Sequence, residues 1–270
     1  MELILECTGC GGAVVYDANR EQAACVFCGA EALDRQEVEE PAEVPDGILP
    51  QEVTLAAAQE EYRAWARSSW WHPEEMRNLS VDLQLLLIPA WRFEGDVESH
   101  WNGLESAVTK SGKRPVGGSD EARLVHMLPA SQGISAAELT ELEPFYIEKV
   151  QPWVGVGEEA PYELPGLTEQ AARSQMHSLM SDVHVQVIAA RHRLLSCVAS
   201  SLVQNETVQL LVLPVFIGAF RFRDRPWRFV VNAQTGEVVG DAPVDRMKVL
   251  AVTLGTVVAL GLLGAIFSEM

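Results

Sequence analysis

Hydrophobic positions in the middle of the chain first recur with a helical period and then with the period of a strand. In residues 54–67 the apolar side chains recur at helical spacing behind Thr54, whose hydroxyl is a suitable N-cap. Residues 83–101 begin as an apolar run and continue with alternating polarity. This pattern is typical of a strand that enters a turn at Glu94-Gly95-Asp96. The two patterns together predict a helix followed by antiparallel strands.

The same order of patterns recurs later in the chain. A helical stretch over 168–190 precedes an apolar run over 210–222, and Ile88-Pro89-Ala90-Trp91 aligns with Leu213-Pro214-Val215-Phe216. Because proline cannot donate to a strand ladder, we expect both prolines at edge positions or bulges. The repetition predicts an α+β core domain over 52–245, built from two similar helix-plus-antiparallel-sheet halves.

The apolar pattern ends in a tail that predicts a single transmembrane helix over 247–267. Residues 249–267 carry no charge, and a helix of 19 residues spans about 28 Å, close to the hydrocarbon thickness of a bilayer. The membrane-proximal basic residues Arg246 and Lys248 place the bulk of the chain in the cytoplasm, at the inner membrane. Small residues at Ala251, Gly255 and Ala259 suggest a homo-oligomer through the tail. The alternative is a helix buried in a protein core.

Four of the five cysteines form two CxxC pairs and predict a tetrahedral zinc site. Cys7 and Cys10 are followed after 14 residues by Cys25 and Cys28, and a glycine follows each pair. Four thiolates complete the coordination of Zn²⁺, so such a site is structural, and in so short a segment the metal would supply most of the folding free energy. The alternative is two disulfides, which need an oxidising compartment. The sequence therefore predicts a zinc ribbon over 1–30, with structural Zn²⁺ as the cofactor.

The 270-residue chain carries a formal net charge of −18, which argues against nucleic acid as a partner. Residues 31–61 supply half of that charge. The first part of this stretch, 31–51, also contains three prolines and predicts an acidic linker, although an acidic docking tail is an alternative. Four arginines near one predicted hairpin are candidates for contact with anionic headgroups or a partner: Arg221, Arg223, Arg225 and Arg228.

Catalytic motifs of the nucleotide-binding, zinc-protease and serine-hydrolase types are missing from the sequence, which therefore predicts no enzyme and no catalytic residue. His177, His184 and His192 are seven and eight residues apart and would lie near one helical face. No Cys or carboxylate lies at ligand spacing beside them, so packing or surface roles are favoured over a metal site. Cys197 stands alone in an apolar run, as expected of a small buried hydrophobic residue.

The chain resembles a bacterial family of membrane-anchored proteins with an N-terminal transcription factor IIB-type zinc ribbon. The resemblance extends over nearly the whole chain: the two CxxCG knuckles, the segment 62–73, the IPAWRF and LPVF strands, and RFVVNAQTGEVVGDAP over 228–243. The chain departs from the family pattern at Phe216, where the family usually has tryptophan, and at Val244-Asp245-Arg246. The resemblance implies a non-enzymatic adaptor that operates beside stomatin/prohibitin/flotillin-type or phage-shock-type membrane proteins.

We therefore expect a tail-anchored cytoplasmic adaptor or scaffold at the inner membrane, whose zinc ribbon and acidic linker recruit protein partners. Two other functions stay open. One is a membrane-tethered zinc-ribbon transcription or nucleic-acid-binding factor, although acidic residues outnumber the single Arg20 within residues 1–30. The other is an enzyme of unknown reaction that uses the three histidines and Cys197.

Overall fold

The computed structural model describes residues 2–9, 12–17, 24–27, 30–36, 43–79, 81–108, 112–155, 160–222 and 225–268. The strands are β1 Glu2–Cys7, β2 Ala13–Asp17, β3 Leu33–Gln36, β4 Gly47–Ile48, β5 Leu83–Ser106, β6 Lys113–Pro129, β7 Gln151–Pro152, β8 Tyr162–Glu163, β9 Leu194–Phe222, β10 Arg225–Asn232 and β11 Val238–Gly240. The helices are α1 Leu55–Ser68, α2 Glu74–Arg77, α3 Ala136–Leu142, α4 Glu169–Arg191 and α5 Arg246–Ser268. Within these residues the strands form one mixed eleven-stranded sheet, in the order β11-β10-β9-β5-β8-β2-β1-β3, with β6 beside β5 and with β4, which also pairs with β7, beside β9.

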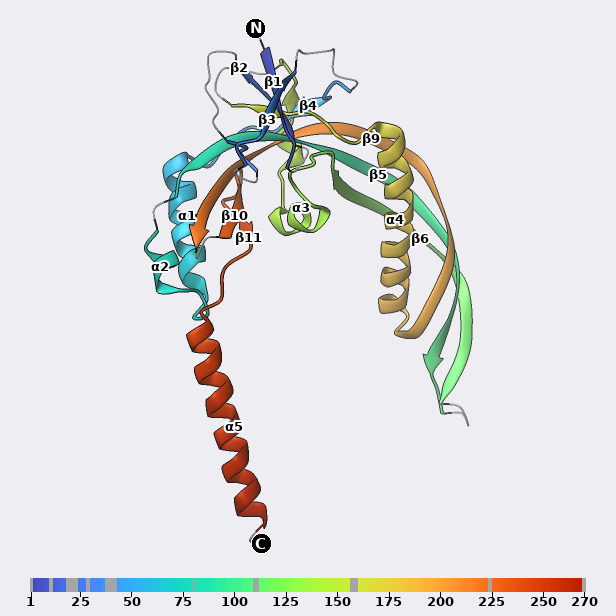
Figure 1. Ribbon diagram of the computed structural model, residues 1–270. Helices are drawn as coiled ribbons and strands as arrows, with labels where there is room; N and C mark the ends of the chain where they lie inside the picture. Colours follow the sequence, from blue (N-terminus) through green and yellow to red (C-terminus); the bar gives the residue numbers. More distant parts are fainter. Residues whose placement is uncertain are drawn as a thin grey trace.

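Two long strands form the middle of this sheet. β5 and β9 pair antiparallel from Leu83 opposite Gly218 to Glu105 opposite Leu194, and they arch over α3 with α4 beside one arm (Figure 1). The predicted turn at Glu94-Gly95-Asp96 is wrong, because β5 continues through it with a β-bulge between Glu94 and Asp96. A bulge bends a strand without ending it, so the polar residues that resemble a turn lie inside a continuous strand.

Both motif prolines lie in these central strands, and the prediction of edge positions or bulges is wrong. Pro89 is opposite Val212, and Pro214 is opposite Leu87. At each proline, pairing with one neighbouring strand ends and pairing with a different strand begins on the same edge. β5 pairs with β8 at Leu87 and with β6 from Ala90, whereas β9 pairs with β4 up to Val212 and with β10 beyond Pro214. The missing N–H of proline therefore falls between two neighbouring strands.

The two helices that precede the long hairpins pack on different parts of the shared sheet. α1 lies over β9 and β10, where the ring of Tyr62 stacks on Phe229 at a centroid distance of 4.3 Å. α4 places Met176 and Met180 against Phe93 of β5, in a cluster that also includes β6 and β9 side chains. The predicted core of two similar helix-plus-antiparallel-sheet halves is therefore wrong. Long-range pairing of β5 with β9 merges the two units into one mixed sheet, and α4 packs on strands of both units.

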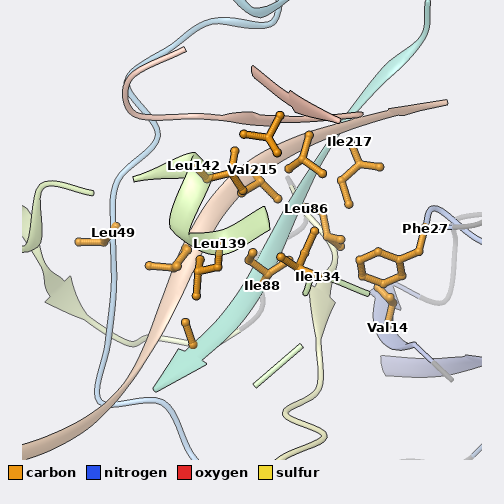
Figure 2. Close-up of a cluster of buried hydrophobic side chains, with 14 of the residues drawn as sticks. Val14, Phe27, Leu49, Leu86, Ile88, Ile134, Leu139, Leu142, Val215 and Ile217 are labelled. Carbon is orange, nitrogen blue, oxygen red and sulfur yellow. The ribbon is translucent and has the colours of Figure 1, made fainter. Parts of the chain in front are cut away.

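A third cluster joins α3, the central strands and the N-terminal segment (Figure 2). Leu139 and Leu142 of α3 belong to the same buried cluster as Ile88 of β5, and Val14 and Phe27 join it from the N-terminal segment. β2 also pairs with β8, where Val14 is opposite Glu163. The N-terminal strands are therefore part of the main sheet, and the prediction of a self-contained zinc ribbon over 1–30 is wrong as a description of the fold.

Parts of the predicted acidic linker over 31–51 also belong to the sheet. β3 pairs with β1, with Leu33 opposite Cys7. The Asp46 carboxylate accepts a hydrogen bond from the Leu210 backbone N–H at 2.7 Å, and β4 follows directly along β9. Residues 37–42 lie outside the described residues. This acidic stretch is thus joined to the sheet at both ends, by β3 on one side and by β4 on the other.

Helix α5 leaves the rest of the fold at a joint with the turn that follows α1 (Figure 1). The Lys248 ammonium donates to the carbonyl oxygens of Trp70 at 2.7 Å and His72 at 3.0 Å. The Asp245 N–H donates to the carbonyl oxygen of Trp71 at 2.9 Å. One of the two predicted membrane-proximal basic residues therefore anchors α5 to the chain itself.

The predicted transmembrane helix over 247–267 is wrong. In the part of the chain that the structure describes, none of the helices combines the length and the apolar character that a membrane crossing needs. The single-pass inner-membrane localisation rested on this helix and is corrected with it.

Candidate functional site

A pocket of about 770 Å³ lies where α3 faces the ends of β9, β10 and β11. Phe27 of the N-terminal segment and Ala219 of β9 contribute to its wall, so three distant parts of the chain meet there. Two of the four arginines that the sequence singled out, Arg225 and Arg228, line it. Arg223 lies outside the described residues, and so does the side chain of Arg221. The structure thus brings two of the predicted contact residues to one site.

Arg228 is held in the wall of the pocket by hydrogen bonds to other parts of the chain. Its guanidinium donates to the carbonyl oxygen of Gly133 and to the carboxylate of Glu138. Glu138 also closes a capping box with Ser135 at the start of α3. Burial alone would raise the pKa of Glu138, but the hydrogen bonds from Ser135 and the charge of Arg228 outweigh it and hold that pKa below its usual value. Arg228 therefore joins β10 to α3.

The other charged groups of the pocket are available to a ligand. Arg225 is exposed, and no ion pair engages it among the described residues. Glu141 and Asp241, which line the same pocket, are exposed and form no ion pair with any described residue. The indole Nε1–H of Trp227 is buried, and within the described chain it finds no acceptor. The pocket therefore offers one cation and two carboxylates to a ligand, whereas the Trp227 N–H is enclosed.

A buried carboxyl group, Glu163, lies directly behind this wall. Its Oε1 accepts hydrogen bonds from the backbone N–H groups of Gln132 at 2.9 Å and Gly133 at 3.2 Å. The side chain is fully buried, and burial raises the pKa of Glu163 to about 7, against the lowering effect of these hydrogen bonds and of Arg228. Sequence reasoning missed Glu163. The only available signal was a lone acidic residue in the short apolar segment 160–164.

A row of Ser99, His184 and Asp120 has the order of a catalytic triad. The Ser99 hydroxyl is 2.7 Å from His184 Nδ1, and His184 Nε2 is 3.1 Å from Asp120 Oδ1. Both Ser99 and His184 are fully buried, and Ser99 is also 2.8 Å from the Ser201 hydroxyl. A nucleophile must reach a substrate, and this hydroxyl has no exposed surface. The row therefore joins α4 to β5, β6 and β9.

The histidines that the sequence grouped do not form one site. His177 pairs with Glu206, whereas the ring of His192 contacts the ring of Trp101 in a tilted arrangement at a centroid distance of 4.7 Å. His184 and His192 both face Asp120, but His192 is 3.8 Å from it and half exposed. Cys197 lies on β9, and burial raises the pKa of its thiol, which opposes thiolate reactivity. The three histidines and Cys197 therefore share no pocket.

The segment 228–243, one of those that carry the family resemblance, contains a structural turn. Asn232 is buried, and its side-chain Nδ2 donates to the carbonyl oxygens of Leu142 at 2.8 Å and Pro144 at 3.1 Å. Its Oδ1 accepts from the Gln234 N–H at 2.8 Å. Gly236 follows with a φ of 85°, which favours glycine. The segment locks the end of α3 to the β10–β11 turn.

The predicted zinc ligands are only partly described. Cys7 and Cys25 are buried, and each Sγ accepts a hydrogen bond from the N–H two residues later, Gly9 at 3.3 Å and Phe27 at 3.4 Å. Among the described residues no group of three His, Cys, Asp or Glu side chains is placed to hold a metal. Cys10 and Cys28 lie outside those residues, so structural Zn²⁺ at the four cysteines stays a prediction that metal analysis of the purified protein can test.

No family model, no curated protein and no solved structure matches this chain. The resemblance to the bacterial zinc-ribbon family therefore stays a prediction, and the function has to be argued from the geometry.

Proposed function

We propose that the chain is a non-enzymatic adaptor that binds a peptide segment of a partner protein in the α3 pocket, defined as the pocket between α3 and the ends of β9–β11. The observation that carries this proposal is a group of charged side chains around one hollow that form no ion pair within the described chain: Arg225, Glu141 and Asp241. Arginine is among the side chains that dominate the energetics of protein interfaces.

The charges of the pocket favour a peptide that carries both signs. Arg225 would meet an acidic side chain, and Glu141 with Asp241 would meet a basic one. A nucleic acid would place phosphates beside two free carboxylates, so the pocket does not favour the alternative of a nucleic-acid-binding factor. Stomatin-type and phage-shock-type partners stay predictions from the resemblance.

The polar row of Ser99, His184 and Asp120 supports an adaptor more than a hydrolase. Its serine is fully buried beneath α4, and its histidine is held between two hydrogen bonds. Glu163 is also enclosed, on the far side of the Gly133 backbone from the pocket. These groups stabilise contacts between elements, and the uncommitted groups of the α3 pocket are those that can meet a ligand.

Selection from a soluble random-sequence peptide library with the full-length chain tests this function. We expect selected peptides to combine an acidic and a basic position, and to bind in a fluorescence anisotropy titration. Arg225→Glu should weaken binding of these peptides about tenfold or more and select a basic residue in place of the acidic one. Glu141→Lys should change the preference at the other position.

Arg63→Glu is the matched control, because Arg63 lies on α1, on the opposite face of β9 and β10, and pairs only with the exposed Glu60. We expect this variant to bind the selected peptides like the original chain. Selection that yields no binding peptide, or binding that is equally strong in the Arg225→Glu and Arg63→Glu variants, would contradict the proposal.

A further inference from the structure

The far parts of β5, β6 and β9 form a three-stranded arm beside α4 (Figure 1). On this arm β9 pairs with β5, from Leu194 opposite Glu105 to Gln204 opposite Asp96. The pairs of β9 with β4 and β10 begin later, at Leu211 and Val215. Along residues 196–204, the other side of β9 therefore has no strand partner within the described residues. We call this stretch the free edge.

The two edges of the arm differ in their protection against strand pairing. β6 forms the opposite edge and carries five charged residues and two glycines: Lys113, Arg114, Asp120, Glu121, Arg123, Gly117 and Gly118. The free edge reads SCVASSLVQ, without a charge, a proline or a glycine. Charged residues and prolines are the usual means by which a protein prevents edge-to-edge pairing. The free edge therefore has the composition of a strand that pairs.

Side chains of the free edge point to two faces. Val203 and Ser201 belong to the face that packs beneath α4, through the cluster around Met176 and the hydrogen bond to Ser99. Val198 and Leu202 lie on the outward face and are 70% and 59% exposed. Two large apolar side chains on an unpaired and uncharged strand mark a surface that gains free energy when a second strand covers it.

We propose that two copies of this chain form a two-fold dimer by antiparallel pairing of their free edges about Ser200. Only a two-fold axis at Ser200 places Val198 of one copy directly opposite Leu202 of the other, twice, so that each exposed apolar side chain meets an apolar partner. Ser200 then meets its own copy, and Ser196 lies opposite Gln204. No charge faces a like charge, and the sheet continues across the interface as an isologous contact.

Paired charges at these positions test the geometry in solution. In the double variant Val198→Lys/Leu202→Lys, each lysine would lie opposite a lysine of the other copy, and we expect association about tenfold weaker or more. In Val198→Lys/Leu202→Glu, each lysine would lie opposite a glutamate, and the dimer should persist. Sedimentation equilibrium and light scattering of the full-length chain over a range of concentrations measure both, with micromolar dissociation expected for the original chain because the interface is small.

The two double variants change the same exposed positions, so circular dichroism and thermal unfolding should find them equally folded. Val125→Lys is a further control. Val125 is 49% exposed on β6, the charged opposite edge of the arm, so this change should not alter association. A monomeric original chain at every concentration would overturn the proposal. Association that the double-lysine variant leaves unchanged would also overturn it, and would assign the contact to another surface.

Cysteine cross-linking tests the register. Two cysteines at a two-fold axis have Cα atoms about 4.5–5.5 Å apart, within the range of a disulfide. In a Cys197→Ser background, Ser200→Cys should therefore form an oxidised dimer on a non-reducing gel. Ser196→Cys is the matched control, because the two copies of this exposed position would be about 27 Å apart. Cross-linking at 196 in preference to 200, or equal cross-linking at both, would overturn the register.

Discussion

At the scale of single residues, the buried polar groups of this chain hold segments together that are distant in sequence. Asn232, Glu163 and Asp120 each bind backbone or side-chain groups from another element. A buried polar group is stable only when it is satisfied, so each of these residues fixes the position of its partners. The contribution of each of these three side chains to the free energy of unfolding should therefore depend on its charge as well as on its shape.

Asn232→Asp should destabilise the fold at neutral pH by about 3 kcal/mol, because a carboxylate would replace the amide N–H groups that face two carbonyl oxygens. Urea unfolding at pH 7 measures the loss. Near pH 4 the loss should shrink, since a protonated Asp can again donate a hydrogen bond. Asn102→Asp is the control at an exposed position of β5 and should change stability by less than about 0.5 kcal/mol. An equal loss in both variants would contradict the role of Asn232.

Glu163 should make the fold less stable as pH rises. The pKa of this buried carboxyl is raised from 4.5 to about 7, so the folded protein retains a proton that the unfolded chain releases. The stabilisation is complete below pH 4.5 and is lost as pH rises to about 7, by about 3 kcal/mol. Glu163→Gln removes this titration and keeps an acceptor for the two backbone N–H groups.

The measurement is the free energy of unfolding of both proteins between pH 4 and pH 8. The quantity to compare is the difference between Glu163→Gln and the original chain, because other carboxyl groups titrate in both. We expect this difference to move by about 3 kcal/mol in favour of Glu163→Gln over that range. A constant difference would show that Glu163 does not change its charge there.

At the scale of elements, α4 combines an apolar face with one buried polar row. Met176 and Met180 fill the apolar contact, and His184 then binds Asp120 of β6 and Ser99 of β5. Asp120 also accepts from Arg191 at 2.7 Å. Burial raises the pKa of Asp120, but the hydrogen bonds from His184 and Arg191 outweigh it and leave the pKa below its usual value.

Asp120→Ala should therefore destabilise the fold by about 2 kcal/mol at neutral pH, since His184 Nε2 loses its acceptor. The stabilisation by Asp120 is present above its unfolded pKa of 3.8 and is lost as pH falls through its lower folded pKa. Urea unfolding at pH 7 and pH 3 should find a smaller difference at pH 3, and amide exchange should quicken in α4. Asp182→Ala, on the exposed face of α4, is the control.

Helices could be predicted from the sequence more fully than the sheet. The expected helix over 54–67 is found at Leu55–Ser68, with Thr54 as its N-cap, because amphipathic period and capping are local properties. The pairing of β5 with β9 joins residues that are 89 to 135 positions apart, from Glu105 with Leu194 to Leu83 with Gly218, and no local pattern specifies it. The turn expected at Gly95 was wrong for the same reason, since a bulge and a turn share the same residue types.

The candidate site could be predicted only in part. Arg225 and Arg228 stood out because arginines gather near one hairpin, and both line the α3 pocket. Glu141 and Asp241 did not stand out, because an isolated acidic residue in an acidic chain carries no signal. Tertiary contacts with α3 give these residues a shared location, and those contacts depend on the arch of the two long strands.

At the scale of the whole molecule, one contact joins the N-terminal strands to the layer that holds the α3 pocket. Phe27 lies over Gly133, where an added Cβ would be 2.1 Å from the ring. Glu163 binds the same loop from β8, and β8 pairs with β2. The N-terminal segment is therefore coupled to the α3 pocket, through the loop at Gly133 and through Phe27, which is part of the pocket wall.

Gly133→Ala should push Phe27 away from the loop, because the added methyl group would overlap the ring. The ring would have to shift by about 1 Å, and it cannot do so without moving the segment that carries it. We expect a loss of about 2–4 kcal/mol, with faster amide exchange in β1–β3 than in β5 and β9. Phe27→Ala alone should cost about 3 kcal/mol through a cavity. In the double variant the alanine at 133 no longer meets a ring, so the combined loss should fall short of the sum by about 1–2 kcal/mol. Additive losses would mean that the N-terminal segment is held elsewhere, and the α3 pocket would then form without it.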